Sequence, residues 1–205
     1  DPLWSRGLGD VYKRQDRVRV AERTGATAVA MAASRLTPDQ ILTGKSIENA
    51  LRVLLAIGGS TNGIVHLTAI AGRLGIDINL AGLDRISRET PVLVDLKPSG
   101  QHYMEDFHHA GGMPALLREL RPFLHLDALT VSGRTLGEEL DDAPAPFKQD
   151  VIRSAADPIY PVGGLAVLRG NLAPGGAIIK QSAANPKLME HEGRAVVFED
   201  AEDMA

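Results

Sequence analysis

Residues 50–80 read ALRVLLAIGGSTNGIVHLTAIAGRLGIDINL and predict two consecutive amphipathic helices joined by a glycine turn. Apolar residues recur at helical spacing in both halves of this stretch. Gly58-Gly59 interrupts the first helix, Ser60-Thr61-Asn62 opens the second, and Gly75 terminates it. We expect Ser46 to cap the first of the two helices. The apolar faces are formed by Ala50, Val53, Leu54 and Ile57 in the first helix and by Ile64, Leu67, Ala71 and Leu74 in the second.

The sequence around this stretch alternates between helical and strand-like patterns. Helices are predicted over 17–34, from Thr37-Pro38 onward, and over 82–89, 104–110, 113–120 and 135–140. Residues 76–80 are expected to be extended, and buried strands are predicted at 91–94 and 128–131. This alternation indicates the α/β fold class.

The composition changes after residue 140. Residues 141–149 are rich in proline and polar side chains, which is typical of a linker. Strand signals separated by glycine and proline follow at 165–168, 177–180 and 195–198 and predict a β-rich unit. We therefore expect the end of an α/β domain at 16–145 and the first part of a β-rich domain at 146–205. Residues 1–15 (DPLWSRGLGDVYKRQ) are typical of a non-native leader translated from adaptor DNA, with a native N-terminus as the alternative.

Composition and charge exclude several classes of function. The chain has 205 residues, a formal net charge of -4 and no cysteine. Mild acidity argues against a nucleic-acid-binding protein, and no apolar run reaches the roughly 20 residues of a membrane span. Because there is no cysteine, the chain can supply no thiol nucleophile and no thiolate ligand for zinc or for an iron–sulfur cluster.

The first candidate site is the turn at 58–62. Glycines allow a ligand close to the backbone, and the N-terminus of a helix favours a carboxylate or phosphate. The alternative is an ordinary helix–helix junction, in which glycine ends one helix and Ser60 caps the next. The turn lacks the lysine of a phosphate-binding Walker loop.

The second candidate site is the segment Lys97-Pro98-Ser99-Gly100 and the His-rich residues that follow it. Histidines and carboxylates at this density can hold a divalent metal, but a wall of a polar pocket or plain surface pairs are the alternatives. In a helix, Glu105 and His109 share a face, whereas neighbouring His108 and His109 do not. The other polar members of the cluster are His102 and Asp106.

Glycine also flanks the predicted strand in residues 163–177, which suggests either turns of a small β unit or a backbone that lines a ligand cavity. Arg169 in this stretch is of the type that pairs with a carboxylate. His66, on an otherwise apolar helix, is expected to be a core residue rather than a ligand.

Taken together, four segments resemble the dihydroxy-acid/6-phosphogluconate dehydratase family, and the resemblance covers residues 16–205. These segments are residues 50–80 quoted above, DRISRETPVLVDLKPSGQHYMEDFHHAGGMPALLREL, LTVSGRTLGEEL, and DVIRSAADPIYPVGGLAVLRGNLAPGGAIIKQSA. The resemblance implies an α/β N-terminal domain, a β-rich swivelling C-terminal domain and a site between them. Residues 105–120, 125–140 and 180–200 are more similar to the sugar-acid dehydratases of this family, such as the arabinonate enzymes.

The resemblance implies a hydro-lyase that removes water from a dihydroxy or aldonic acid with an iron–sulfur cluster, Mg²⁺ and a serine base. The chain has no motif that matches the family's cysteine ligands, magnesium ligands or catalytic serine. No catalytic, metal or cluster residue is therefore carried over, and we interpret the chain as an internal fragment of a longer protein. The remaining candidates for substrate binding are Ser60, Thr61, Asn62, Lys97 and Ser99.

We thus expect part of a cytoplasmic dehydratase that converts an aldonic acid such as arabinonate to a 2-keto-3-deoxy acid. The alternatives are dihydroxy-acid dehydratase of branched-chain amino-acid biosynthesis and, in another class, a non-catalytic module that binds carboxylates. The expected partner is a small hydroxy acid, with no nucleic acid or membrane, and the longer protein is expected to form a homo-oligomer. We expect this chain alone to bind no cluster or Mg²⁺, to be inactive and to fold poorly, since its β unit lacks partner strands.

Overall fold

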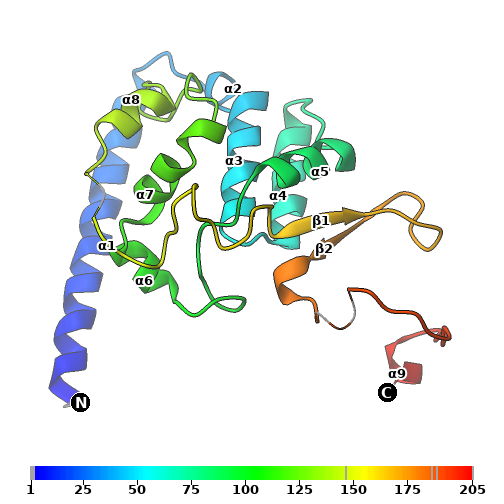
Figure 1. The fold of residues 1–205 in the computed structure, drawn as a ribbon. Helices are drawn as coiled ribbons and strands as arrows, with labels where there is room; N and C mark the ends of the chain where they lie inside the picture. Colours follow the sequence, from blue (N-terminus) through cyan, green and yellow to red (C-terminus); the bar gives the residue numbers. More distant parts are fainter. Residues whose placement is uncertain (1–2, 146, 186, 188, 205) are drawn as a thin grey trace.

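A computed structural model of the chain describes residues 3–145, 147–185, 187 and 189–204. Figure 1 shows helices packed side by side, a β-hairpin at one edge and the two ends of the chain on opposite sides. The helices are α1 Leu3–Ala32, α2 Pro38–Ile41, α3 Gly44–Ala56, α4 Thr61–Arg73, α5 Leu80–Glu89, α6 Met104–His109, α7 Gly112–Glu119, α8 Leu136–Asp141 and α9 Ala201–Met204, with 3-10 turns at Arg121–Phe123 and Gln181–Ala183. The hairpin consists of β1 Leu165–Leu168 and β2 Ala177–Lys180.

The described residues are mostly helical, and helices α1 to α8 precede the small sheet of β1 and β2. This order agrees with an α/β domain that ends and a second domain that begins. The helices predicted at 82–89, 104–110, 113–120 and 135–140 are confirmed within a few residues. Residues 1–2 of the predicted leader and residue 146 at the predicted boundary lie outside the described residues. The described part of the predicted leader, from residue 3 onward, belongs to α1.

Side-chain capping at the helix starts explains where these helices begin. Ser60 caps α4, as predicted, and Asn79 caps α5 through its Oδ1, which accepts the Gly82 amide at 2.8 Å. The prediction for α3 is wrong, because the cap is Thr43 rather than Ser46. Thr43 Oγ1 accepts the Ser46 amide at 3.4 Å, and Ser46 Oγ accepts the Thr43 amide at 2.8 Å. Ser46 therefore supplies the second half of a capping box.

A first hydrophobic core joins α3, α4 and α5 to the β-hairpin. Leu55 and Leu83 are buried at its centre, together with Leu165 from β1, which is only 1% exposed. The hairpin pairs antiparallel in the register Leu165 with Lys180 and Leu168 with Ala177. The first strand of the second domain is therefore part of the core of the first.

A second core lies between the end of α3, the extended residues 92–94 and α7. Leu93, Leu116 and Leu120 are fully buried there, and Val151 and Ile152 reach this core from beyond the linker. Both cores therefore take residues from each side of the linker at 141–149.

Three of the predicted strands do not form, since a strand needs a partner for its ladder of backbone hydrogen bonds. Residues 92–94 are buried as expected, but they make only single bridges, Val92 with Tyr160 and Val94 with Ile152. Residues 128–131 make one bridge, Leu129 with Thr135, within a tight turn. Residues 195–198 are not paired with any described strand and are exposed.

An ion-pair network fixes α3 against α5. The Arg52 guanidinium, with a side chain only 7% exposed, lies 2.7 Å from a carboxylate oxygen of Glu48 and 2.7 Å from one of Glu89. It also donates to Thr90 Oγ1 at 3.2 Å. Arg85 adds a second cation at 3.0 Å from Glu89. The network lies at the point where α5 ends at Glu89 and the extended segment after it begins.

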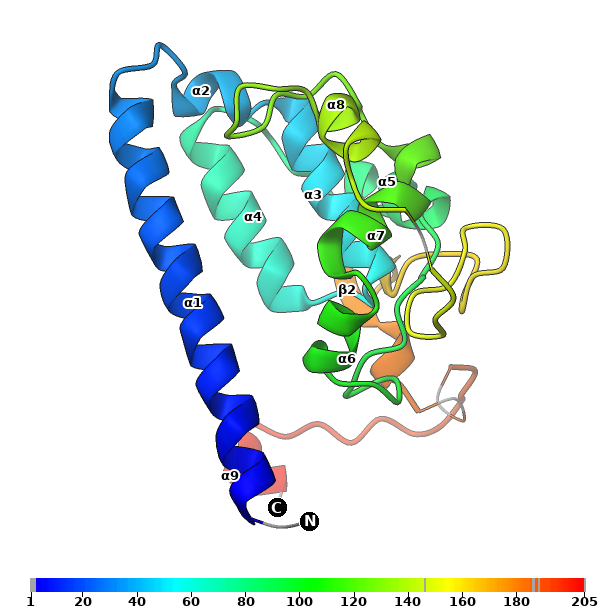
Figure 2. The ribbon, with the colours of Figure 1, turned by 90° about the vertical axis from the view of Figure 1, so that its left-hand side faces the viewer.

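Helix α1 stands along one side of the molecule in Figures 1 and 2, and its described side chains are almost all exposed. None of the helices among the described residues combines the length and apolar character that crossing a membrane requires.

Candidate functional site

The turn before α4 holds three of the five predicted site residues. Gly58 and Gly59 adopt φ values of +100° and +77°, and two consecutive left-handed residues strongly favour glycine. Ser60 is half-buried, and its Oγ accepts the Gly63 amide at 3.2 Å. Thr61 and Asn62 are exposed at the positive end of the 13-residue helix α4. The turn can therefore receive an anionic group such as a carboxylate.

The other two predicted residues lie on the loop between residues 96 and 103. Lys97 and Ser99 are exposed, and Lys97 Nζ sits 3.8 Å from the centre of the Tyr103 ring. Gly100 is pressed against Asp95, since a Cβ on Gly100 would lie 2.2 Å from Asp95 Oδ1. The loop therefore has a defined shape, in which a cation–π contact orients the Lys97 ammonium.

Backbone hydrogen bonds tie the segment that precedes the Lys97 loop to the end of α3, from which the Gly58-Gly59 turn starts. The Ala56 carbonyl, near the end of this helix, accepts the Leu93 amide at 2.8 Å and the Val94 amide at 3.2 Å. The chain therefore reaches the Gly58-Gly59 turn and the Lys97 loop within a few residues of one hydrogen-bonded point. In Figures 1 and 2 the turn lies at the lower end of α3, and the loop that leads into α6 extends further down, beside α6. They remain separate loops: in the described part of the chain no hydrogen bond or ion pair joins Lys97 to Ser60, Thr61 or Asn62.

The glycine-rich stretch at 163–177 contacts the Gly58-Gly59 turn. The sequence did not predict this contact. The Gly163 amide donates to the Ser87 carbonyl at 2.8 Å, and Gly164 packs against the backbone of Gly58. Gly163-Gly164 therefore serve a purpose that neither interpretation of this stretch named, which is close packing against another turn of the chain. Arg169 is exposed in the loop between β1 and β2.

The His-rich segment forms pairs rather than a metal site. His102 Nε2 lies 3.8 Å from Asp95, and its Nδ1 lies 4.0 Å from Asp106. Glu105 and His109 approach within 3.8 Å, which confirms that they share one face of α6. Among the described residues, no group of three or more histidine, cysteine, aspartate or glutamate side chains could hold a metal ion.

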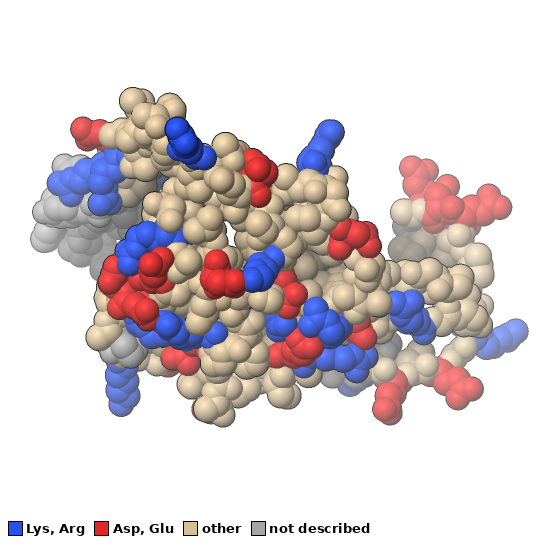
Figure 3. All heavy atoms as spheres, turned by 90° about the horizontal axis from the view of Figure 1, so that it is seen from above, with Lys and Arg blue, Asp and Glu red and all other residues tan. Residues whose placement is uncertain are grey.

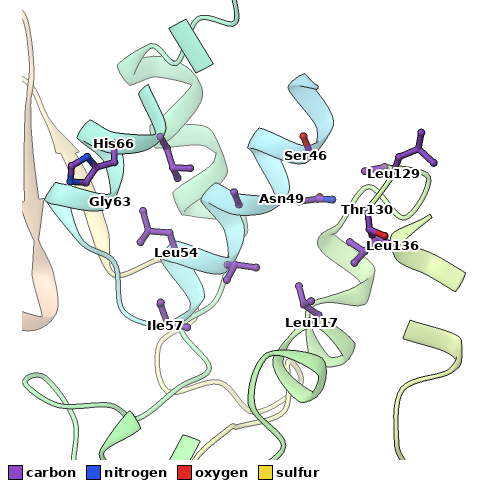
Figure 4. A pocket seen from close by; sticks show the side chains of 14 residues that line it. Ser46, Asn49, Leu54, Ile57, Gly63, His66, Leu117, Leu129, Thr130 and Leu136 are labelled. Atoms are coloured by element: carbon purple, nitrogen blue, oxygen red, sulfur yellow. The ribbon is translucent and has the colours of Figure 1, made fainter. Parts of the chain in front are cut away.

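An apolar cavity of about 520 Å³ opens between α3, α4, α7 and residues 128–136 (Figure 4). The predicted site residues do not line it. His66 does, and it is exposed, so the expectation that His66 belongs to the core is wrong. The helix turns this side chain away from Ile64 and Ala71, which carry the buried face of α4.

Charges of both signs are interspersed on the face in Figure 3. Within the ion-pair network, burial raises the pKa of the Glu48 carboxyl, but the hydrogen bond and charge of Arg52, with His125 and Arg85 nearby, bring that pKa below its ordinary value. The hydrogen bond from Arg52 lowers the pKa of Glu89. These shifted groups belong to helix packing and lie outside the two candidate loops.

Sequence models of protein families match almost the whole chain. The model of the dihydroxy-acid/6-phosphogluconate dehydratase N-terminal domain matches residues 11–139, and that of the C-terminal domain matches residues 150–205. The chain belongs to the dihydroxy-acid/6-phosphogluconate dehydratase family. The Gly58-Gly59 turn and the Lys97 loop lie within the N-terminal match, whereas Gly163, Gly164 and the hairpin lie within the C-terminal match.

Curated relatives of this dehydratase family carry two kinds of name. The chain is 50% identical to a protein named L-arabinonate dehydratase from Rhizobium leguminosarum bv. trifolii, over 90% of the chain and 32% of the relative. It is 48% identical to an L-arabonate dehydratase from Azospirillum brasilense, over 90% of the chain and 32% of the relative. It is 45% identical to a dihydroxy-acid dehydratase from Acetivibrio thermocellus, over 93% of the chain and 34% of the relative. The chain thus spans about a third of the length of these relatives.

Proposed function

We propose that the chain is part of a longer hydro-lyase that removes water from a sugar acid such as arabinonate and yields a 2-keto-3-deoxy acid. The observation that carries this proposal is the 50% and 48% identity to the two relatives named for arabinonate. Dihydroxy-acid dehydratase is the second candidate, because relatives with that name match at 43–47% identity.

In this proposal the two loops at the end of α3 form part of the wall of the substrate cavity. The positive end of α4 at Ser60, Thr61 and Asn62 attracts the carboxylate of the acid. Lys97 adds a positive charge, and Ser99 adds a hydroxyl that can bond to the hydroxyls of a sugar acid. These residues bind and orient the substrate, and none of them is proposed as the acid or base.

We further propose that the longer protein uses an iron–sulfur cluster and Mg²⁺, as the family resemblance implies. The residues of this chain do not fit either group, because the chain has no cysteine and its described residues form no carboxylate and histidine cluster. We therefore propose that the ligands of the cluster and of Mg²⁺ lie in the remainder of the longer protein. A cytoplasmic homo-oligomer is the proposed state of the longer protein.

The decisive experiment begins with the coding DNA on both sides of this segment. The longer protein would be expressed without oxygen and assayed for 2-keto acid formation from arabinonate and from a branched 2,3-dihydroxy acid. We expect turnover of arabinonate. Turnover of the branched acid alone would favour the second candidate, and carboxylate binding without turnover of either acid would favour a binding module.

The 205-residue chain provides a separate control. Purified under the same conditions, it should contain no iron and convert neither acid. An active, iron-containing preparation of this chain alone would contradict the placement of the cluster ligands elsewhere.

A further inference from the structure

A glycine pair from each of the two family-matched regions lies at the turn before α4, where Gly164 packs backbone to backbone against Gly58. A Cβ placed on Gly164 would lie 2.2 Å from the Gly58 carbonyl oxygen and 2.8 Å from the Gly58 Cα. A Cβ on Gly59 would lie 2.6 Å from the Leu165 side chain. The contact at Gly164 is with backbone atoms, so a side chain there requires the backbone to move, whereas the contact at Gly59 is with the buried Leu165 side chain. The spacing between the turn and the start of β1 therefore requires glycine at Gly164, and the φ of +77° together with the Leu165 contact favours glycine at Gly59.

Hydrogen bonds hold the second pair of glycines in this place. The Gly163 amide donates to the Ser87 carbonyl at 2.8 Å, and the Gly164 carbonyl accepts the Gln181 amide at 3.0 Å. The buried Ser87 hydroxyl donates to the Leu165 carbonyl. The start of β1 is thus fixed both to α5 and to the residue that follows β2, so it forms a rigid surface under the turn.

We infer that this junction, defined as Gly58, Gly59, Gly163 and Gly164, positions the Ser60–Asn62 turn for substrate binding. Gly164 and Ser87 are then positioning residues, because they act on the substrate through that turn and do not touch it. The inference rests on the proposed function, since it takes Ser60–Asn62 as part of the wall of the substrate cavity. The start of β1, in the region matched by the C-terminal model, then influences substrate affinity through its contact with the turn.

The variant Gly164→Ala tests this inference in the longer protein. Its new methyl group must push the Gly58 turn away, so the start of α4 shifts while the chemistry elsewhere is untouched. We expect KM for the hydroxy acid to rise by about tenfold, with kcat changed much less, as for a loss of uniform substrate binding. Hydrogen exchange should become faster in the peptide that covers residues 58–64 and stay unchanged in α7 and α8.

Two further variants separate positioning from loss of folding. Ser87→Ala removes one hydrogen bond to Leu165 without a clash, and it should change KM and exchange in the same direction by a smaller factor. Gly175→Ala is the matched control, because a Cβ there meets nothing within 4 Å. It should behave like the wild type. If Gly164→Ala does not fold, Ser87→Ala still provides both measurements.

The outcomes distinguish this inference from the proposed function. Unchanged exchange at residues 58–64 in Gly164→Ala and Ser87→Ala would overturn the inference, because the junction would not hold the turn. Faster exchange with an unchanged KM would also overturn it, because the turn would not contribute to binding. Absence of hydro-lyase turnover in the wild type would instead reject the proposed function.

Discussion

Arg52 is a buried cation that connects two helices. Its guanidinium contacts Glu48 on α3 and Glu89 at the end of α5, and it is 6% exposed as a residue. Removing one partner of a buried ion pair costs more than the pair itself contributes, because the remaining charge stays partly desolvated. Composition and periodicity gave no sign of this network, because it depends on how α3 and α5 pack.

Replacing Arg52 with methionine should therefore destabilise the chain. Methionine keeps the apolar stem but removes the buried cation, so that only Arg85, at the surface, still pairs with Glu48 and Glu89. We expect a loss of about 2 kcal/mol in the free energy of unfolding. Urea denaturation followed by circular dichroism measures this. The matched control is Arg88→Met. Arg88 pairs with Asp84, and the Arg88 side chain is 73% exposed. The control should cost about 0.5 kcal/mol or less, and equal losses in both variants would contradict the buried role of Arg52.

The same network predicts how stability depends on acidity. The pKa values of Glu48 and Glu89 lie below the ordinary carboxyl value of 4.5 in the folded chain. Between the folded pKa values and 4.5, the unfolded chain therefore binds more protons than the folded chain, so the free energy of unfolding rises with pH. This contribution is present above 4.5 and is lost as the pH falls through the folded pKa values.

Urea midpoints measured between neutral pH and acid should show this loss in the wild type. The slope should become shallower in Arg52→Met, because the two carboxyls then titrate closer to their ordinary value. An identical pH profile in the two proteins would show that other groups cause the acid sensitivity.

At the scale of whole elements, the sequence predicts helices better than strands. A helix closes its hydrogen bonds within itself, so a cap such as Ser60 and the apolar period suffice to place it. A strand needs a partner that the local sequence does not contain. Residues 91–94 therefore became a buried extended segment with single bridges, and residues 195–198 stayed exposed. Turns form at both predicted positions, residues 58–60 and 97–100, but the contact between Gly58 and Gly164 could not be predicted from spacing.

The start of α3 gives a direct test at this scale. Thr43→Ala removes the hydroxyl that accepts the Ser46 amide, and we expect a loss of about 1 kcal/mol in the free energy of unfolding. Thr43→Ser keeps the hydroxyl and should stay within about 0.5 kcal/mol of the wild type. Urea denaturation compares the two variants. A cost below the experimental error for Thr43→Ala would show that α3 begins elsewhere.

At the scale of the whole molecule, residues 141–149 separate two regions of the sequence, but both hydrophobic cores contain residues from each of these regions. The two family models meet around residues 140–149, yet Leu165 is buried among α3, α4 and α5, and Val151 and Ile152 complete the second core. A β-hairpin alone is at best marginally stable in water. The first hairpin of the region matched by the C-terminal model is therefore stabilised by contacts with the region matched by the N-terminal model.

Truncation distinguishes this packing from two independent units. A chain that ends at residue 149 loses Val151, Ile152 and Leu165 from the two cores, and each buried aliphatic side chain contributes about 1.5–3 kcal/mol. That sum approaches the whole stability of a typical domain, so we expect broad, non-cooperative unfolding and binding of a hydrophobic dye. A chain that ends at residue 188 should keep the midpoint and slope of the full chain, because the described residues 189–204 are exposed. Cooperative unfolding of the shorter chain, with an unchanged midpoint, would show that the N-terminal region folds without the hairpin.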